Sequence, residues 1–177
     1  GRADPFGGFW IGTMGKHAER GSGALYRFYC GEVVRLRCGV TIPNATCFAP
    51  DGRIAFFADT AEHIVWRIPL DAEGWPKAEW EVWLDHRASG INPDGAVVDA
   101  EGRFWCAEWG GARVTCYDAD GFLVEEISLD VPQPTCPAFG GEGLSALFLT
   151  SARQGLPSDE IDEAPRSGMT FAVSTTI

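Results

Sequence analysis

The sequence predicts an all-β fold built from repeated small sheets, the organisation of a β-propeller. A Gly-containing turn followed by an apolar strand occurs four times, and aligning the strand aromatics Trp10, Phe57, Trp105 and Phe148 gives gaps of 47, 48 and 43 residues. A period of about 40–50 residues with about four short strands is typical of a propeller blade. One small twisted sheet cannot bury both faces, so neighbouring sheets must stack on it. About four blades are therefore expected.

The strands of each repeat can be assigned in order from β-branched and aromatic residues. The strands with the aligned aromatics fall within residues 4–13, 50–60, 99–109 and 140–152. Each is followed by a segment that we interpret as its partner, at residues 23–30, 63–70, 112–121 and 169–175. After three of them comes a further β-type segment, at residues 32–40, 79–85 and 124–131.

Helical signals are weak. The run SDEIDEAPRSG has Ser158 as a candidate N-cap and Pro165 as a stop signal. We expect at most a turn or two of helix there.

The stretch GINPDGAVVDAEGRFWCAEWGG is predicted to form a loop, a strand, a tight turn and a second strand. The strands are expected at residues 96–98 and 104–106, with AEG as the turn. Asp94 stands in a P-D-G tripeptide, in which proline presets φ and glycine accepts a positive φ. Taken alone, Asp94 is a turn residue, and the same reasoning applies to Asn44 after its proline.

Length and composition indicate one globular domain over residues 1–177, with 45% hydrophobic and 12% aromatic residues. Only 14 basic residues stand against 25 acidic ones, with no Lys/Arg cluster, which argues against nucleic acid as a partner. No apolar run approaches the roughly 20 residues of a membrane helix. The start, GRADPFGGFW, lacks signal-peptide features. We expect a cytoplasmic protein without a membrane partner, and the oligomeric state stays open.

The six cysteines are expected to be buried free thiols. No two form a C-x-x-C pair, and several fall within apolar strand segments. A disulfide is the second alternative, and a metal site built from cysteines is the third.

Several motifs in order resemble one known family. They are GRADPFGGFWIGTMG, GALYRF, IPNATCFAPDGRIAFFADT, NPDGAVVDAEGRFWCAEWGGARVTCYDADG, VPQPT, FGG and LTSARQGL. Together they resemble the senescence marker protein 30, gluconolactonase and luciferin-regenerating enzyme family from residue 1 to about residue 173. The resemblance implies a six-bladed β-propeller, of which this chain holds about four blades, with an N-terminal portion of about a hundred residues missing.

The resemblance also implies a divalent metal ion at the top of the central channel and hydrolysis of a sugar lactone. By motif, the family's metal-binding Asn falls on Asn44 in IPNAT and its Asp on Asp94 in NPDGA. The third ligand, a Glu, would precede residue 1. The usual Gly after the Asn is replaced by Ala45. The substrate-contacting Arg and Asn of the family would also precede residue 1, and Lys16 and His17 replace a Glu after the G-T-M motif.

The chemistry of lactone opening fits these residue types. A hard cation with oxygen ligands can polarise the carbonyl, and Ca²⁺ or Zn²⁺, with Mn²⁺ or Mg²⁺ as further candidates, is the implied cofactor. Asp94 is expected to be both a metal ligand and the general base, and Asn44 a neutral ligand. Candidate pocket residues lie in loops and at strand ends, where each also has an ordinary structural interpretation: His17, Asp59, Glu108, Trp109 and Thr135.

Two alternatives remain open at this level. The same propeller could bind calcium in a regulatory role without catalysis. The chain could also be an inactive fragment that lacks a complete site.

Overall fold

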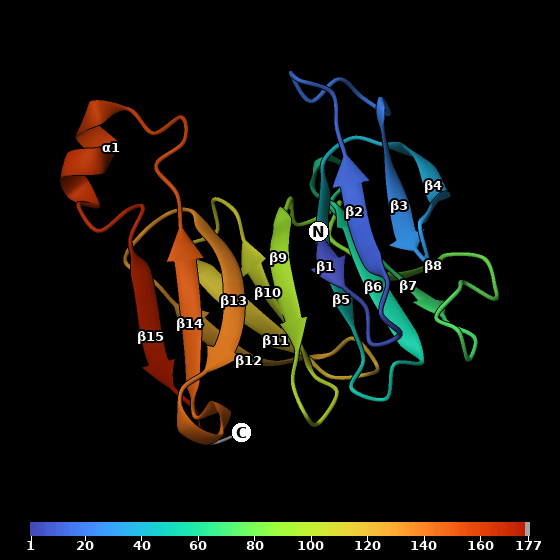
Figure 1. Ribbon diagram of the computed structural model, residues 1–177. Helices are drawn as coiled ribbons and strands as arrows, with labels where there is room; N and C mark the ends of the chain where they lie inside the picture. Colours follow the sequence, from blue (N-terminus) through green and yellow to red (C-terminus); the bar gives the residue numbers. More distant parts are fainter. Residues whose placement is uncertain (176–177) are drawn as a thin grey trace. The chain divides into compact units, whose positions relative to one another are not determined.

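The structure is a computed structural model that describes residues 1–175. It divides into two compact units, a first unit of residues 1–93 and a second unit that begins at Asp94. Strands in the described residues form antiparallel sheets whose order follows the chain (Figure 1). The all-β prediction is confirmed.

The first unit contains two four-stranded sheets. One is formed by β1 (Arg2–Ala3), β2 (Phe9–Thr13), β3 (Gly23–Tyr29) and β4 (Glu32–Val40). The next is formed by β5 (Pro43–Phe48), β6 (Ile54–Asp59), β7 (Ile64–Pro69) and β8 (Glu81–Asp85), with the 3₁₀ turn η1 (Thr60–Glu62) between β6 and β7.

The second unit contains a four-stranded and a three-stranded sheet. The first is formed by β9 (Pro93–Val98, whose first residue belongs to the first unit), β10 (Phe104–Glu108), β11 (Arg113–Tyr117) and β12 (Leu123–Ser128). The last is formed by β13 (Pro134–Gly140), β14 (Ala146–Ser151) and β15 (Thr170–Ser174). The 3₁₀ turn η2 (Glu142–Leu144) precedes β14, and the helix α1 (Ser158–Glu163) precedes β15.

The predicted repeat is confirmed at the level of strands. The four aligned aromatics all fall in the second strand of a sheet, namely β2, β6, β10 and β14. In the last repeat the aligned residue lies on the exposed face of its strand and not on the core face. Phe148 is 39% exposed, whereas Leu147 and Leu149 are buried. A shift of one residue in a strand moves a side chain to the opposite face.

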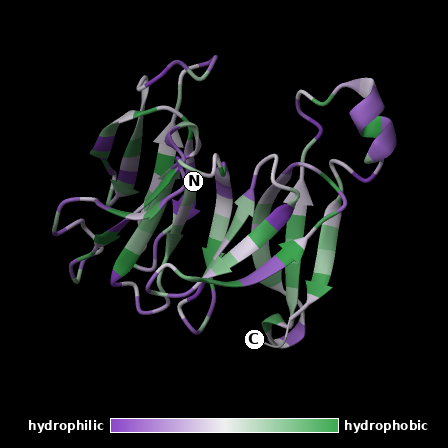
Figure 2. Cartoon of the chain, turned by 180° about the vertical axis from the view of Figure 1, so that it is seen from behind, coloured by the Kyte–Doolittle hydropathy of each residue, from purple (hydrophilic) through white to green (hydrophobic). Residues whose placement is uncertain are grey.

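Each unit has an apolar core formed mainly by the second and third strands of its sheets. In the first unit Trp10, Leu25 and Phe57 are fully buried and belong to one cluster. In the second unit Trp105 packs in a cluster with Leu147 and Leu149. Figure 2 shows the resulting bands of apolar residues along the strands. β2 and β14 alternate between more and less buried residues, as the two-residue period of a strand predicts, whereas β6 and β10 are buried along nearly their whole length.

A buried ion pair holds the first sheet at its turn. Asp4 accepts hydrogen bonds from the N–H groups of Phe6 (2.9 Å) and Gly8 (2.8 Å), from Trp10 Nε1 (3.1 Å) and from Arg27 Nε (2.7 Å). Neither side chain of the Asp4–Arg27 pair is exposed. Burial alone would raise the pKa of Asp4, but the hydrogen bonds from Arg27 and the backbone outweigh it and lower the pKa.

The Arg27 guanidinium has further contacts. It donates from Nη2 to the Glu73 carbonyl (2.9 Å) and lies 4.5 Å from the ring centre of Tyr29 and 4.3 Å from that of Trp75. Such cation–π contacts stabilise a desolvated charge.

The same turn recurs in the second unit with a more exposed partner. Asp99 accepts from the N–H groups of Glu101 and Arg103, from Trp105 Nε1 (2.8 Å) and from Arg103 Nε (2.7 Å). Here Arg103 is 31% exposed. Asp99 thus has a structural role in this turn.

Three local predictions need correction. Asp94 is not in a turn: it is the second residue of β9, and Gly95 does not have a positive φ. Ser158 is the first helical residue rather than the N-cap, a position taken by Pro157, although the helix does stop before Pro165. The six cysteines are free thiols, but Cys30 and Cys38 are exposed.

Candidate functional site

Three of the candidate residues occupy the same place in three sheets. The first strand of each sheet begins with a proline followed by a polar residue: Pro43–Asn44 in β5, Pro93–Asp94 in β9 and Pro134–Thr135 in β13. Each of these strands is at the edge of its sheet. Proline is tolerated there because the first residue of an edge strand need not donate to the ladder. The repeat therefore places Asn44, Asp94 and Thr135 equivalently.

Asn44 is held by a chain of hydrogen bonds within the first unit. Its Nδ2 donates to Thr60 Oγ1 (2.8 Å), and Thr60 Oγ1 donates to the Pro93 carbonyl (2.6 Å). Among the described residues, the Asn44 Oδ1 atom accepts no hydrogen bond. The amide therefore has an oxygen available to a ligand.

The residue after Asn44 explains the local backbone. Ala45 has a φ of +52°, and the register between β5 and β6 shifts between Asn44 and Cys47. A non-glycine residue in the left-handed region is strained by contacts of its Cβ atom. This strain explains why the family resemblance implies a glycine at the position of Ala45.

Asp59 is buried and has a structural role. Its carboxylate accepts from the N–H groups of Thr41 (2.7 Å), Ile42 (2.9 Å) and Ala61 (3.2 Å). It is the N-cap of η1. Asp59 thus fixes the turn that carries Thr60, and its predicted place in a substrate pocket stays a prediction.

Asp94 is a half-buried carboxylate at the start of the second unit. Burial raises the pKa of Asp94 to about 6, and the N–H of Gly95 opposes this rise only in part. No positively charged side chain among the described residues forms an ion pair with it. A neighbouring cation would favour the ionised form and lower this pKa.

The backbone beside Asp94 packs closely on the first strand of the next sheet. A Cβ atom on Gly95 would lie 2.5 Å from Cys136 Sγ and 2.7 Å from the Thr135 carbonyl oxygen. Only glycine fits such a close approach. The sequence predicted Asp94 and Thr135 as two separate candidate residues. Within the second unit they lie near each other, because Gly95, next to Asp94, packs against the backbone of Thr135.

The metal-binding set is incomplete in the described residues, which contain no group of three or more His, Cys, Asp and Glu side chains able to hold an ion. Two of the three implied ligand types are present. Asn44 offers a neutral oxygen and Asp94 an uncompensated carboxylate, and both are ligands that a hard divalent cation prefers. The residues present fit such an ion. Asn44 belongs to the first unit and Asp94 to the second.

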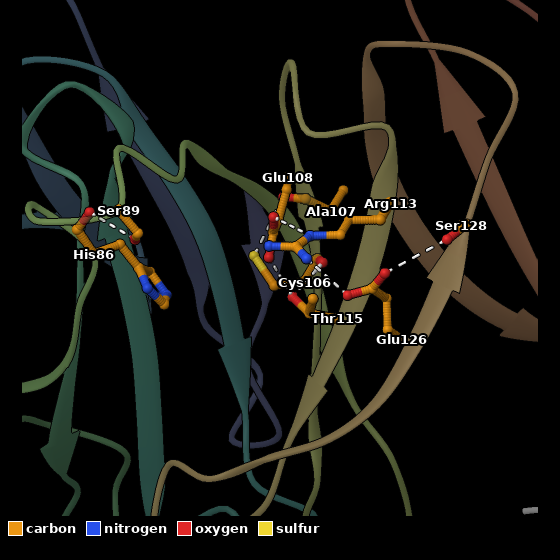
Figure 3. A network of polar contacts seen from close by, with 9 residues as sticks. All are labelled: His86, Ser89, Cys106, Ala107, Glu108, Arg113, Thr115, Glu126 and Ser128. Atoms are coloured by element: carbon orange, nitrogen blue, oxygen red, sulfur yellow. Dashed lines mark hydrogen bonds and ion pairs between the residues drawn. The ribbon is translucent and has the colours of Figure 1, made fainter.

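Glu108 is buried and paired within its own sheet. Its Oε2 accepts from Arg113 Nε (2.7 Å) and its Oε1 from Thr115 Oγ1 (2.9 Å). Arg113 also donates from Nη1 to Glu126 (2.7 Å), as Figure 3 shows. The hydrogen bond to Glu108 raises the pKa of Arg113. Both carboxylate oxygens of Glu108 are therefore already used inside the sheet.

The other pocket candidates differ in their surroundings. Thr135 Oγ1 lies 2.7 Å from Thr150 Oγ1, across the ladder from β13 to β14. Trp109 follows β10 and is half-buried. His17 is exposed in the loop between β2 and β3, and its backbone N–H donates to Glu19 (3.1 Å). Their roles in substrate binding stay predictions.

Sequence reasoning did not find the polar junction around η1. His63 has a φ of +56°, and its Nδ1 lies 2.9 Å from the Ile91 carbonyl oxygen. No local sequence pattern predicts this contact or the hydrogen bond from Thr60 to Pro93, because each joins segments about 30 residues apart. The repeated Pro-polar pair was visible in the sequence and could have linked Asn44, Asp94 and Thr135.

Comparison with known proteins identifies the family. The sequence model of one protein family, described as the SMP-30/Gluconolactonase/LRE-like region, matches residues 1–153 of this chain. The chain belongs to this family, as its motifs predicted. None of the helices in the described part of the chain is long and apolar enough to cross a membrane.

Two relatives and one solved structure illustrate the similarity. A 6-deoxy-6-sulfogluconolactonase of Pseudomonas putida is 37% identical over 178 residues, with 100% of this chain and 61% of the relative covered. An L-arabinolactonase of Azospirillum brasilense is 33% identical over 179 residues, with 99% and 59% covered. A solved crystal structure, that of a calcium-binding protein, regucalcin, from Agrobacterium tumefaciens strain C58, matches with a TM-score of 0.94 and 43% sequence identity. The match covers 97% of this chain and 59% of the regucalcin chain.

These matches support the β-propeller class of fold. The chain spans about three fifths of the length of these relatives.

Proposed function

We propose that the protein hydrolyses a sugar lactone with the help of a divalent cation held by Asn44 and Asp94. The observation that carries the proposal is Asp94. It is a carboxylate whose pKa burial raises to about 6, without a positive partner, in a chain of the gluconolactonase family. A carboxylate that is partly removed from water and has no positive partner is costly for a fold, and such perturbed groups are typical of functional sites.

The roles of the residues follow from the reaction. A water oxygen attacks the lactone carbonyl carbon, the bond from this carbon to the ring oxygen breaks, and a hydroxy acid is released. Asp94 takes the proton of the attacking water and returns it to the departing ring oxygen. When bound, a divalent cation supplies an electrophile for the carbonyl and lowers the pKa of a nearby water.

Asn44 and Asp94 have distinct tasks in this proposal. Asn44 contributes an oxygen without adding charge, so the cation remains electrophilic. Asp94 contributes the negative charge and the proton acceptor. The family resemblance implies a Glu as a further ligand, and its carboxylate would complete the ligand set.

The names of two relatives support the substrate class, because one is a sulfogluconolactonase and the other an arabinolactonase. Sugar lactones are thus the substrates to test first. The calcium-binding regucalcin supports a divalent cation as cofactor, and Ca²⁺ and Zn²⁺ are the first candidates.

Metal removal and replacement test this function in the full-length protein. Hydrolysis of a panel of five- and six-carbon sugar lactones is followed by proton release after chelation and after addition of Ca²⁺, Zn²⁺, Mn²⁺ or Mg²⁺. Activity is expected to fall on chelation and to return with at least one cation. Asp118→Asn is a matched control, because Asp118 is an acid that accepts only N–H bonds within an exposed turn. Undiminished hydrolysis after chelation would contradict the metal-dependent mechanism.

A regulatory calcium-binding protein is the second candidate, favoured by the name of the similar regucalcin structure. Calorimetry distinguishes the two. Cation binding without hydrolysis of any lactone in the panel would support the regulatory role.

A further inference from the structure

The turn η1 lies at a junction of three segments of the first unit. Its N-cap, Asp59, binds the N–H groups at the start of the segment that leads to Asn44. Two further side chains reach the segment that leads to Asp94: Thr60, the first residue of η1, bonds the Pro93 carbonyl, and His63, its C-cap, bonds the Ile91 carbonyl. These bonds to alternate carbonyls resemble those that a neighbouring strand would make.

The hydrogen-bond inventory at Thr60 fixes the direction of each bond. A threonine hydroxyl has one proton, and a carbonyl oxygen can only accept. Because the Thr60 hydroxyl lies 2.6 Å from the Pro93 carbonyl oxygen, its proton is used there. Thr60 can then only accept from Asn44, at 2.8 Å. The atom of Asn44 that faces Thr60 must be the NH₂ group.

We propose that Thr60 is a positioning residue that selects the orientation of the Asn44 amide, so that the oxygen and not the NH₂ group is presented to a cation. The proposal rests on the proposed function, since Asn44 is the neutral ligand there. The side-chain amide has a nearly two-fold torsion, so both orientations would otherwise be accessible. Only the oxygen has a lone pair for a hard cation.

Two substitutions separate the hydroxyl from the shape of Thr60. Thr60→Val keeps the volume but removes the acceptor for Asn44 and the donor for Pro93. Thr60→Ser keeps the hydroxyl. Ser151→Ala is a matched control, because the Ser151 hydroxyl also donates to a carbonyl, that of Met169, and accepts an N–H, that of Gly168. It contacts no candidate ligand.

The first readout needs neither metal nor substrate. In the metal-free full-length protein, NMR measures the exchange of the Asn44 side-chain NH₂ protons with water. Exchange in wild type and Thr60→Ser is expected to be slowed by the bond to Thr60, and in Thr60→Val to be at least about tenfold faster. Exchange at the rate of a free amide in wild type would overturn the proposal, and this result requires no folded variant.

The second readout is cation affinity. Changes to residues that orient a metal ligand typically cost about 10–100-fold in affinity. Calorimetry with Ca²⁺ and Zn²⁺ is expected to show this loss in Thr60→Val, and a change within about threefold in Thr60→Ser and Ser151→Ala. Equal losses in the serine and valine variants would overturn the proposal. If the wild type binds neither cation, the proposed function fails, whereas the amide exchange still decides whether Thr60 orients Asn44.

Discussion

Replacing Asp4 by Asn is expected to destabilise the first unit strongly. The new amide keeps one oxygen for the N–H groups of Phe6 and Gly8. Its NH₂ group would face Trp10 Nε1 and Arg27 Nε, which are both donors. Arg27 would become a buried charge without a counterion. Removing one partner of a buried pair costs about 3–5 kcal/mol.

Asp99 gives an internal comparison for this magnitude. In Asp99→Asn the Trp105 N–H also loses its acceptor, which costs about 1–3 kcal/mol. Arg103, however, is 31% exposed and keeps Glu101 as a partner (3.0 Å), so its charge stays solvated. We therefore expect Asp4→Asn to cost about 2 kcal/mol more than Asp99→Asn.

Equilibrium urea unfolding of the two variants and of the wild type, followed by tryptophan fluorescence and circular dichroism, measures the two differences in the free energy of unfolding. A cost of Asp4→Asn equal to or below that of Asp99→Asn would refute the reasoning. It would mean that burial of the Arg27 charge does not determine the energetics of this turn.

The remaining predictions concern pH, packing and backbone strain. Folding lowers the pKa of Asp4 from its usual 3.8, so the ionised carboxylate contributes its full stability above pH 3.8 and loses it as the pH falls through the lower pKa of the folded state. The difference in the free energy of unfolding between wild type and Asp4→Asn, measured in urea, should therefore shrink below about pH 4. A difference that stays constant with pH would contradict this. Gly95→Ala places a Cβ atom 2.5 Å from Cys136 Sγ, and thermal unfolding should show a loss of about 1–3 kcal/mol, which a wild-type melting temperature would disprove. Ala45→Gly removes the strain at a φ of +52° and should raise the free energy of unfolding by up to about 1 kcal/mol, whereas a clear loss would argue against strain there.

The sheets could be predicted from the sequence because their signals are local. The predicted segment at residues 32–40 coincides with β4, and the four aligned aromatics fall in the second strands. The repeat, the glycine-containing turns and the β-branched and aromatic residues carry this information. The alignment of the aromatics does not fix the face of each one: Phe148 is 39% exposed, whereas its neighbours Leu147 and Leu149 are buried, and a shift of one residue moves a side chain to the opposite face.

The candidate site could be predicted only in part. The motifs pointed to Asn44 and Asp94, but local turn preferences placed Asp94 in a turn, whereas it begins β9. Gly95 is required there by Cys136, a contact between sheets that no local pattern encodes. The link from Asn44 through Thr60 to Pro93 likewise depends on the fold, since it joins three separate segments.

The most direct test of the central claim is the kcat of Asp94→Asn at a cation concentration that saturates the variant. The amide keeps an oxygen ligand but removes the proton acceptor, so binding and proton transfer are separated. The account predicts a loss of kcat by a factor of about 10²–10⁴ with the cation still bound, whereas Asp118→Asn keeps the wild-type rate. A kcat of the cation-saturated Asp94→Asn variant within a few-fold of wild type would contradict the assignment of Asp94 as the base.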